Sequence, residues 1–201
     1  MNNISAFLIF GAPGSGKGTV GAKLANVATG IKHLSTGDIF RGLSPASENG
    51  KLFASYANAG KLVPDEVTIQ IFSRYVGGLI DTNKFDPTKQ TFLLDGIPRT
   101  VEQAELIKNT VNVKHIFVLE ISDHSVIIER LLKRAATKGR KDDIHESVVR
   151  ARIDEYENKT AAVLSVYDPS LITKINGAQA PDEVFRDVLN EYIIVRHKQL
   201  L

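Results

Sequence analysis

Short apolar runs divide the chain and predict buried β-strands. The first run, Ala6-Phe7-Leu8-Ile9-Phe10, is unbroken by any polar residue, and later strands are expected at residues 91–95, 115–121 and 171–175. Unbroken apolar runs of this length are typical of strands that are covered on both faces, as in a parallel sheet. We therefore expect a sheet that is buried between helices.

The polar and apolar positions between these runs predict helices. The signal is clearest at Pro64-Asp65-Glu66, where proline and two acidic residues open a long helix. Within it, Val67, Ile71 and Tyr75 recur at a spacing of four, so we expect this face to pack. Residues 135–139 are too few to predict more than a loop. The other helices are expected to begin near residues 20, 39, 48, 101, 123, 146, 161 and 181.

Strands and helices alternate from one end of the chain to the other. This order predicts an α/β fold, with an open and mostly parallel sheet flanked by helices. At 201 residues, one such domain with small insertions accounts for the length of the chain. Ligands of open parallel sheets bind at the carboxyl ends of the strands, so we expect the chemistry of the chain to lie there.

Composition and charge narrow the class of protein. The chain has no cysteine, which excludes disulfides and thiolate metal sites, and its net charge of +2 gives no electrostatic reason to expect nucleic-acid or membrane partners. No apolar stretch approaches the roughly 20 residues that a membrane span requires. The first predicted strand begins so near Met1 that it leaves no room for a cleavable signal, so we expect a cytoplasmic protein.

A glycine-rich turn connects the first predicted strand to the first predicted helix. It contains Gly-x-x-x-x-Gly-Lys, a pattern that predicts a phosphate-binding loop in this strand–turn–helix context. Backbone N–H groups and the positive end of the helix would surround an anion, and Lys17 would reach the outer phosphates. Gly18 stands where the general motif has a magnesium-binding Ser or Thr, so we expect phosphates and waters to hold magnesium. The loop residues are Gly11, Ala12, Pro13, Gly14, Ser15, Gly16, Lys17, Gly18 and Thr19.

Arginines gather near the boundaries of the predicted elements. A lone arginine usually lies on a solvated face, but guanidinium groups near a phosphate loop bind phosphate oxygens in pairs and stabilise the charge of phosphoryl transfer. Asp142 and Asp143 either stabilise a helix N-terminus or tether the arginines when a flap closes. The candidate arginines are Arg41, Arg99, Arg130, Arg134, Arg140 and Arg152.

Asp95 ends a predicted strand, at the same edge of the sheet as the glycine-rich loop. We therefore expect Asp95 and the loop to line one crevice. His33 and His115 flank or occupy strands, and we interpret both as structural residues. The sequence shows no obvious pair of nucleophile and base that would suggest hydrolysis.

Five motifs, in this order, resemble those of the adenylate kinases in the form with a short lid, and they span most of the chain. The glycine-rich loop matches the family's own variant, including the glycine after the lysine. The most specific motif is Asp95-Gly96-Ile97-Pro98-Arg99-Thr100 with Gln103, although the family more often has Phe or Tyr where Ile97 stands. The other three are Leu34–Asp38 with Arg41, Gly60–Val63, and Arg130–Arg134 with Arg140–Asp143 and Arg152.

This resemblance implies the reversible conversion of ATP and AMP to two ADP, with Mg²⁺ as cofactor. The ATP phosphates would be bound by Gly14, Ser15, Gly16, Lys17, Gly18, Thr19, Arg130 and Arg134. AMP would be bound by Thr36, Arg41, Lys61, Leu62, Val63, Gly96, Arg99, Gln103, Arg140 and Arg152. The catalytic charges would be Lys17, Arg99, Arg130, Arg134, Arg140 and Arg152, while Asp95 would orient waters on the metal.

The resemblance also implies a division of the chain into three parts. The core would comprise residues 1–34, 64–133 and 142–201, with an AMP-binding insertion at residues 35–63 and a short lid at residues 134–141. The two smaller parts would close over the nucleotides and exclude water. Because two moving parts need free surface, we expect a monomer.

Two other functions remain open at this point. A kinase for UMP or CMP would share the fold, although relatives that act on pyrimidines tend to differ at the positions of Thr36 and Gln103. A nucleotide-binding regulator without activity is the second. It would not need positive charge on both sides of a transferred group, which the arginines here supply.

Overall fold

The computed structural model of the chain describes residues 4–138 and 145–198. The strands are β1 (Ile4–Gly11), β2 (Ile31–Ser35), β3 (Thr91–Asp95), β4 (Val111–Glu120) and β5 (Ile172–Asn176). The longer helices are α1 (Lys17–Val27), α2 (Thr36–Arg41), α3 (Glu48–Asn58), α4 (Asp65–Asp81), α5 (Val101–Ile107), α6 (His124–Lys138), α7 (Glu146–Glu155) and α8 (Pro181–Lys198). A π-helical turn follows α7 at Tyr156–Thr160, and 3₁₀ turns lie at Ala161–Val166 and Pro169–Leu171.

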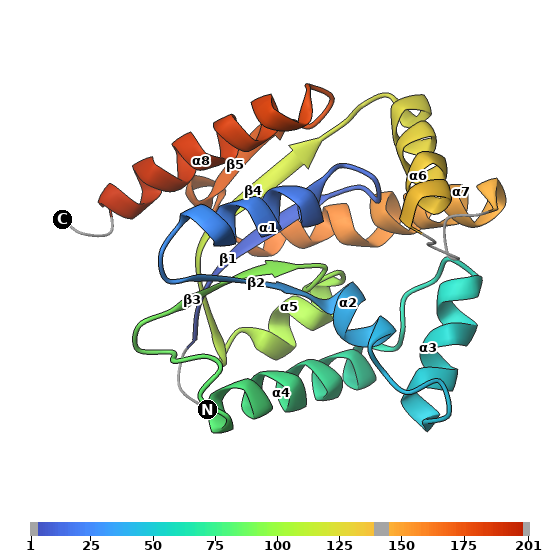
Figure 1. Cartoon of the computed structure of the whole chain (residues 1–201), viewed down its shortest axis with the longest axis horizontal. Helices are drawn as coiled ribbons and strands as arrows, with labels where there is room; N and C mark the ends of the chain where they lie inside the picture. Colours follow the sequence, from blue (N-terminus) through green and yellow to red (C-terminus); the bar gives the residue numbers. More distant parts are fainter. Residues whose placement is uncertain (1–3, 139–144, 199–201) are drawn as a thin grey trace.

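The strands in the described residues form one parallel sheet in the order β2-β3-β1-β4-β5 (Figure 1). Asp95, at the end of β3, pairs with Ile9 of β1 on one side and with Ser35 of β2 on the other. The carboxyl ends of these three strands therefore meet at Asp95. The α/β fold with a parallel sheet, predicted from the sequence, is confirmed.

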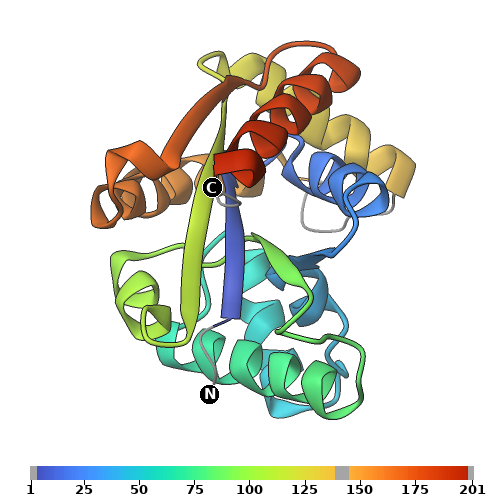
Figure 2. The same cartoon turned by 90° about the vertical axis from the view of Figure 1, so that its left-hand side faces the viewer.

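The central strand β1 supplies side chains to two apolar cores. Ala6, Leu8 and Phe10 join the core formed with α4 and α5, whereas Phe7 and Ile9 join the core formed with α1 and α8. All five side chains are at most 4 % exposed, as expected for a strand that is covered on both faces. Figure 2 shows the sheet edge-on between these two layers of helices.

A third, smaller core lies beneath the glycine-rich loop. Ala12 of the loop packs with Ile127 and Leu131 of α6 and with Val149 and Ile153 of α7. Helices α6 and α7 carry most of the candidate arginines of the second half of the chain. Packing against the loop therefore fixes these two helices next to the place where phosphates are expected to bind.

The structure differs from several local expectations. The strand β2 is absent from the sequence-based prediction, because Lys32 and His33 interrupt its apolar pattern at the edge of the sheet. Tyr75 continues the spacing of Ile71 but is 43 % exposed, because the packed face of α4 turns away from it. Residues 135–138 extend α6 instead of forming a loop. The buried residues of α4 are Thr68, Ile71, Phe72, Val76 and Leu79.

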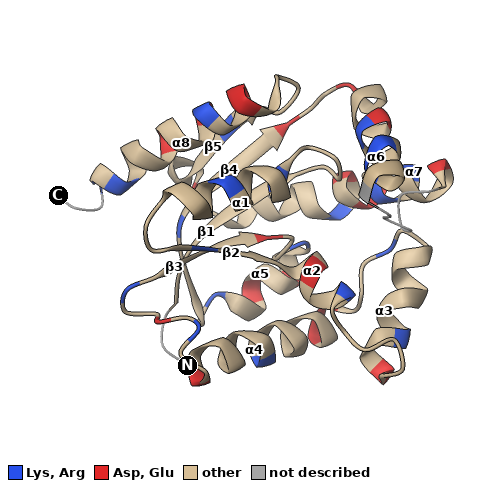
Figure 3. Ribbon diagram, in the orientation of Figure 1, with Lys and Arg blue, Asp and Glu red and all other residues tan. Residues whose placement is uncertain are grey.

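Charged residues of both signs are distributed along α4, α6 and α8 (Figure 3). This mixture agrees with the small net charge of +2. Among the residues that the structure describes, no helix combines the length and the apolar character that crossing a membrane requires.

Candidate active site

The glycine-rich loop runs from the end of β1 to the start of α1, as its sequence predicts. Three of its glycines, Gly11, Gly14 and Gly16, have positive φ angles of 147°, 84° and 98°. These angles disfavour residues with a side chain, so the loop conformation depends on glycine at these positions. At Gly16, an added Cβ would meet no atom within 4 Å, so the backbone there is open to a ligand.

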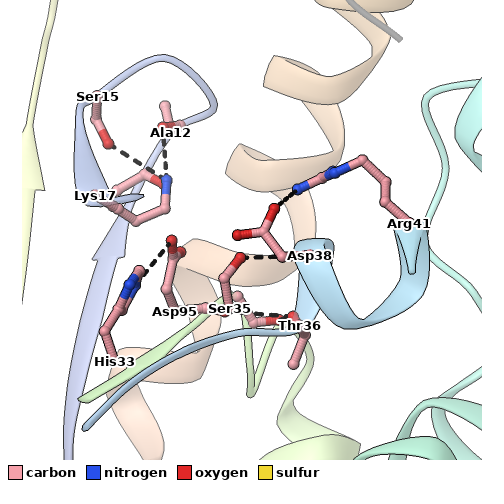
Figure 4. Close-up of polar contacts among 11 residues, drawn as sticks. Ala12, Ser15, Lys17, His33, Ser35, Thr36, Asp38, Arg41 and Asp95 are labelled. Atoms are coloured by element: carbon pink, nitrogen blue, oxygen red, sulfur yellow. Dashed lines mark hydrogen bonds and ion pairs between the residues drawn. The ribbon is translucent and has the colours of Figure 1, made fainter. Parts of the chain in front are cut away.

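Lys17 turns back toward the loop that carries it (Figure 4). Its Nζ donates hydrogen bonds to the carbonyl oxygens of Gly11 at 2.6 Å and Ala12 at 2.9 Å. Burial lowers the pKa of Lys17 to about 8, the charges of Arg99, Arg152 and Arg134 act in the same direction, and Asp95 opposes them. A cation held among other cations and desolvated in this way is well prepared to bind a polyanion.

Asp95 faces the phosphate loop from the end of β3. An added Cβ on Gly18 would lie 3.6 Å from Oδ2 of Asp95, and Nε2 of His33 approaches the same oxygen to 3.7 Å. Burial acts to raise the pKa of Asp95, but His33, Lys17 and Arg99 outweigh it and the pKa is lowered. The carboxylate is therefore ionised next to the loop. That Asp95 and the loop line one crevice stays a prediction, because Asp95 is not among the residues that line the cleft described below.

The turn after β3 holds Arg99 and Thr36 against its own backbone. Nε of Arg99 donates to the carbonyl of Gly96 at 2.8 Å, and Oγ1 of Thr36 donates to the same oxygen at 2.7 Å. Gly96 has a φ of 84°, and a Cβ there would lie 2.6 Å from Nη2 of Arg99 and 2.7 Å from Oγ1 of Thr36. Burial lowers the pKa of Arg99, and Asp95 acts against that shift.

A cleft with a cavity volume of about 150 Å³ extends from the phosphate loop to helices α2 and α3. Its lining joins most of the residues assigned to AMP with the phosphate-loop lysine. The lining residues among those predicted from the sequence are Lys17, Thr36, Arg41, Lys61, Leu62, Val63, Gly96, Arg99, Gln103 and Arg152.

The remaining predicted arginines lie in different surroundings. Arg130 does not line the cleft; it donates to the carbonyls of Gly177, Ala178 and Gln179, in the loop between β5 and α8. The charge of Arg134 acts on Lys17, which places it near the phosphate loop. The other residues assigned to the ATP phosphates are sequence neighbours of Lys17. Gly14, Ser15 and Gly16 precede it in the loop, and Gly18 and Thr19 follow it in the first turn of α1. Arg140, Asp142 and Asp143 lie outside the described residues.

The sequence does not reveal part of the cleft wall. The turn that follows α7 contributes Tyr156 and Thr160, and Thr160 donates to the backbone carbonyl of Arg99 at 3.0 Å. The polar pattern there predicts a regular helix over residues 146–159, whereas the structure has a π-helical turn at Tyr156–Thr160. Such turns occur often at functional sites, but no sequence pattern identifies this one.

Comparison with known proteins agrees with this geometry. The sequence model of the family described as "Adenylate kinase" matches residues 9–171. The chain belongs to the adenylate kinase family. Membership makes it a nucleoside monophosphate kinase, which confirms the reaction class implied by the five motifs.

Several bacterial proteins named "Adenylate kinase" are similar to the chain over most of its length. The protein of Kocuria rhizophila is 35 % identical over 192 residues, covering 92 % of this chain and 97 % of the relative. That of Flavobacterium johnsoniae is 40 % identical over 166 residues, covering 80 % and 83 %. That of Mycoplasma pneumoniae is 34 % identical over 207 residues, covering 88 % and 92 %. The similarity therefore extends well beyond the nucleotide-binding loop.

Proposed function

We propose that the chain transfers a phosphoryl group between ATP and AMP within this cleft, giving two ADP. The observation that supports the proposal most directly is that four cationic side chains from separate parts of the chain line one cleft: Lys17, Arg41, Arg99 and Arg152. Phosphoryl transfer needs mainly positioning and charge stabilisation, and this arrangement can supply both.

Each group has a part in the proposed reaction. The loop amides and Lys17 bind the ATP phosphates, while Arg41 and Arg99 bind the phosphate of AMP. That phosphate is already anionic and can attack without a strong general base. Arg134, Arg140 and Arg152 are assigned to the charge that spreads over the transferred group. Arg130 is left out of this set, because it donates to the loop between β5 and α8 and does not line the cleft.

The residues around Asp95 fit a magnesium ion carried by the nucleotide. Among the described residues, no group of three or more His, Asp or Glu could hold a metal by itself. A single ionised carboxylate opposite Gly18 is suited to orienting waters of a hydrated magnesium ion. When bound, the metal would neutralise phosphate charge.

We also propose the division into a core, an AMP-binding part at residues 35–63 and a lid at residues 134–141. The cleft is lined from residues 36–41 and 53–63, which supports the role of the first smaller part. Movement of both parts requires free surface, and on this ground we propose that the enzyme acts as a monomer. We place its action in the cytoplasm.

The decisive experiment measures ADP formation by the purified chain from ATP, AMP and magnesium. Parallel assays replace AMP with GMP, CMP or UMP. We expect turnover with AMP to exceed that with the other three monophosphates. Comparable rates with UMP would overturn the assignment to adenine, and no product with any monophosphate would favour a regulator.

A second measurement tests the binding of the AMP base. In the variant Gln103→Ala, we expect the KM for AMP to rise far more than the KM for ATP, because we assign Gln103, which lines the cleft, to the base of AMP. An equal effect on both nucleotides would contradict this role.

A further inference from the structure

The side-chain amide of Gln103 is held at both ends. Its Nε2 donates to Oδ1 of Asp65 at 2.7 Å, and its Oε1 accepts from the backbone N–H of Arg99 at 2.8 Å. The residue is only 1 % exposed, yet it forms part of the cleft wall. Asp65 lies behind it, at the start of α4, and accepts a second hydrogen bond from Oγ1 of Thr100 at 2.9 Å.

These two contacts allow one orientation of the amide. If the amide were turned by 180°, Oε1 would face the carboxylate of Asp65 and Nε2 would face the N–H of Arg99. Two hydrogen bonds would be replaced by an acceptor–acceptor contact and a donor–donor contact, which is costly for buried groups. The carboxylate of Asp65 can only accept, because it has no N–H to offer to a reversed amide.

The fixed amide retains capacity for a ligand. An amide has two N–H hydrogens and two oxygen lone pairs. Asp65 uses one hydrogen and Arg99 uses one lone pair. Gln103 can therefore present one donor and one acceptor to a base in the cleft, in an order that Asp65 determines.

This order distinguishes purine bases by their six-position substituent. Adenine offers an amino donor beside a ring-nitrogen acceptor, which complements an oxygen and an N–H in that sequence. Hypoxanthine, which differs only by a keto oxygen at this position and a protonated ring nitrogen, offers the reverse pattern. A reversed base would need a reversed amide.

We propose that Asp65 is a specificity-determining positioning residue, which selects a 6-amino purine over a 6-keto purine by fixing the orientation of Gln103. The inference rests on the proposed function, because it assumes that the monophosphate base lies against Gln103. Asp65 itself is not among the residues that line the cleft and acts through the amide.

The first test compares AMP with IMP as phosphoryl acceptors for the unmodified chain. The two substrates share the phosphate, the ribose and the purine outline, so only the hydrogen-bonding edge differs. We expect kcat/KM for AMP to exceed that for IMP by at least ~10²-fold, as for a site that pairs a polar substrate group. Equal values in the unmodified chain would overturn the proposal without any variant.

The second test uses Asp65→Asn and Asp65→Ala. An asparagine can turn its own N–H toward a reversed Gln103. Alanine removes one of the two contacts that hold the amide and leaves only the hydrogen bond from the N–H of Arg99. We expect the AMP-to-IMP ratio of kcat/KM to fall about tenfold in both variants, the scale of one hydrogen bond to a charged group. The KM for ATP should stay unchanged.

The matched control is Glu66→Gln. It removes one negative charge from the same first turn of α4, but from an exposed side chain. A purely structural role of Asp65 would lower both reactions alike and leave their ratio unmoved, which would overturn the inference. Absence of AMP turnover in the unmodified chain would instead refute the proposed function.

Discussion

The imidazole of His33, on the edge strand β2, lies 3.7 Å from the carboxylate of Asp95, on the neighbouring strand β3. The ring also lies close to the backbone of α1, because an added Cβ on Gly21 would lie only 2.5 Å from Nε2 of His33. Burial acts to raise the pKa of Asp95, and His33 is the largest of the influences that lower it. A residue that the sequence suggests to be structural therefore helps to keep this carboxylate ionised.

We predict that His33→Leu shifts the acid limb of activity to higher pH. The folded pKa of Asp95 is lowered, so its charge is lost only as the pH falls below its usual range. Without His33, the effect of burial, which raises the pKa of Asp95, is counteracted less strongly. The carboxylate then takes up a proton at a higher pH. The pH profile of kcat, measured from pH 4 to 8, checks this, with His33→Gln as a donor-retaining control. Superimposable acid limbs of the Leu variant and the unmodified chain would contradict the prediction.

The pKa of Lys17, about 8, predicts that nucleotide affinity depends on pH. Bound phosphates stabilise the ammonium form and raise this pKa, so above pH 8 binding must take up a proton. The affinity for ATP should fall by up to ~10-fold per pH unit above that point. Titration calorimetry in two buffers of different ionisation enthalpy measures the uptake. Lys17→Met should bind more weakly at pH 7 and lose this dependence, and a dependence that persists would exclude Lys17 as its source.

Arg99→Ala should lower turnover by at least ~10²-fold, the usual scale for loss of a preorganised charge donor. Arg99 is held in place by Gly96 and by Thr160, so its charge requires little rearrangement during the reaction. Arg150→Ala is a suitable control, because Arg150 is exposed and pairs with Glu146 on the surface of α7. Steady-state assays of both variants provide the comparison. Near-normal turnover of Arg99→Ala would remove Arg99 from the site.

Gly96→Ala should impair activity, although it adds only one methyl group. The new methyl group would meet Arg99 and Thr36 at less than 3 Å, on a backbone with a φ of 84°. Both side chains must shift, so we expect a higher KM for AMP together with a lower kcat. Kinetics in which both constants match those of the unmodified chain would show that the turn tolerates the methyl group.

Gly78→Ala should stabilise the protein by about 0.5–1 kcal/mol, because glycine inside a helix costs more conformational entropy than alanine. Gly78 lies within α4, and an added Cβ would meet nothing within 4 Å. Chemical denaturation of the two proteins measures the difference in the free energy of unfolding. A lower stability of the variant would indicate a contact that this geometry does not show.

Sequence patterns predict a strand correctly where every side chain along it is buried. The apolar run of β1 predicts a strand covered on both faces, and its residues are buried in two cores. The same reasoning fails for β2, since edge strands carry polar residues such as Lys32. It also fails for Tyr75, because four residues exceed one helical turn of 3.6 and the packed stripe drifts away from that position.

The candidate site was predictable where short motifs fix the backbone. Gly11, Gly14 and Gly16 of the phosphate loop and Gly96 of the turn after β3 have positive φ angles, which glycine adopts most readily. Contacts between distant segments were not predictable in this way. The approach of His33 to Asp95 depends on strand order, and the bond from Thr160 to Arg99 depends on a π-helical turn. The position of Arg140 remains a prediction.

The middle position of β1 in the sheet has a consequence for synthesis on the ribosome. The strand that emerges first pairs with β3 and β4, which begin only at Thr91 and Val111. Until those segments leave the exit tunnel, the apolar segment of β1 has no partner strand on either edge. An exposed apolar segment of this kind can bind chaperones. Nascent chains halted before Val111 should therefore aggregate more than chains halted after β4.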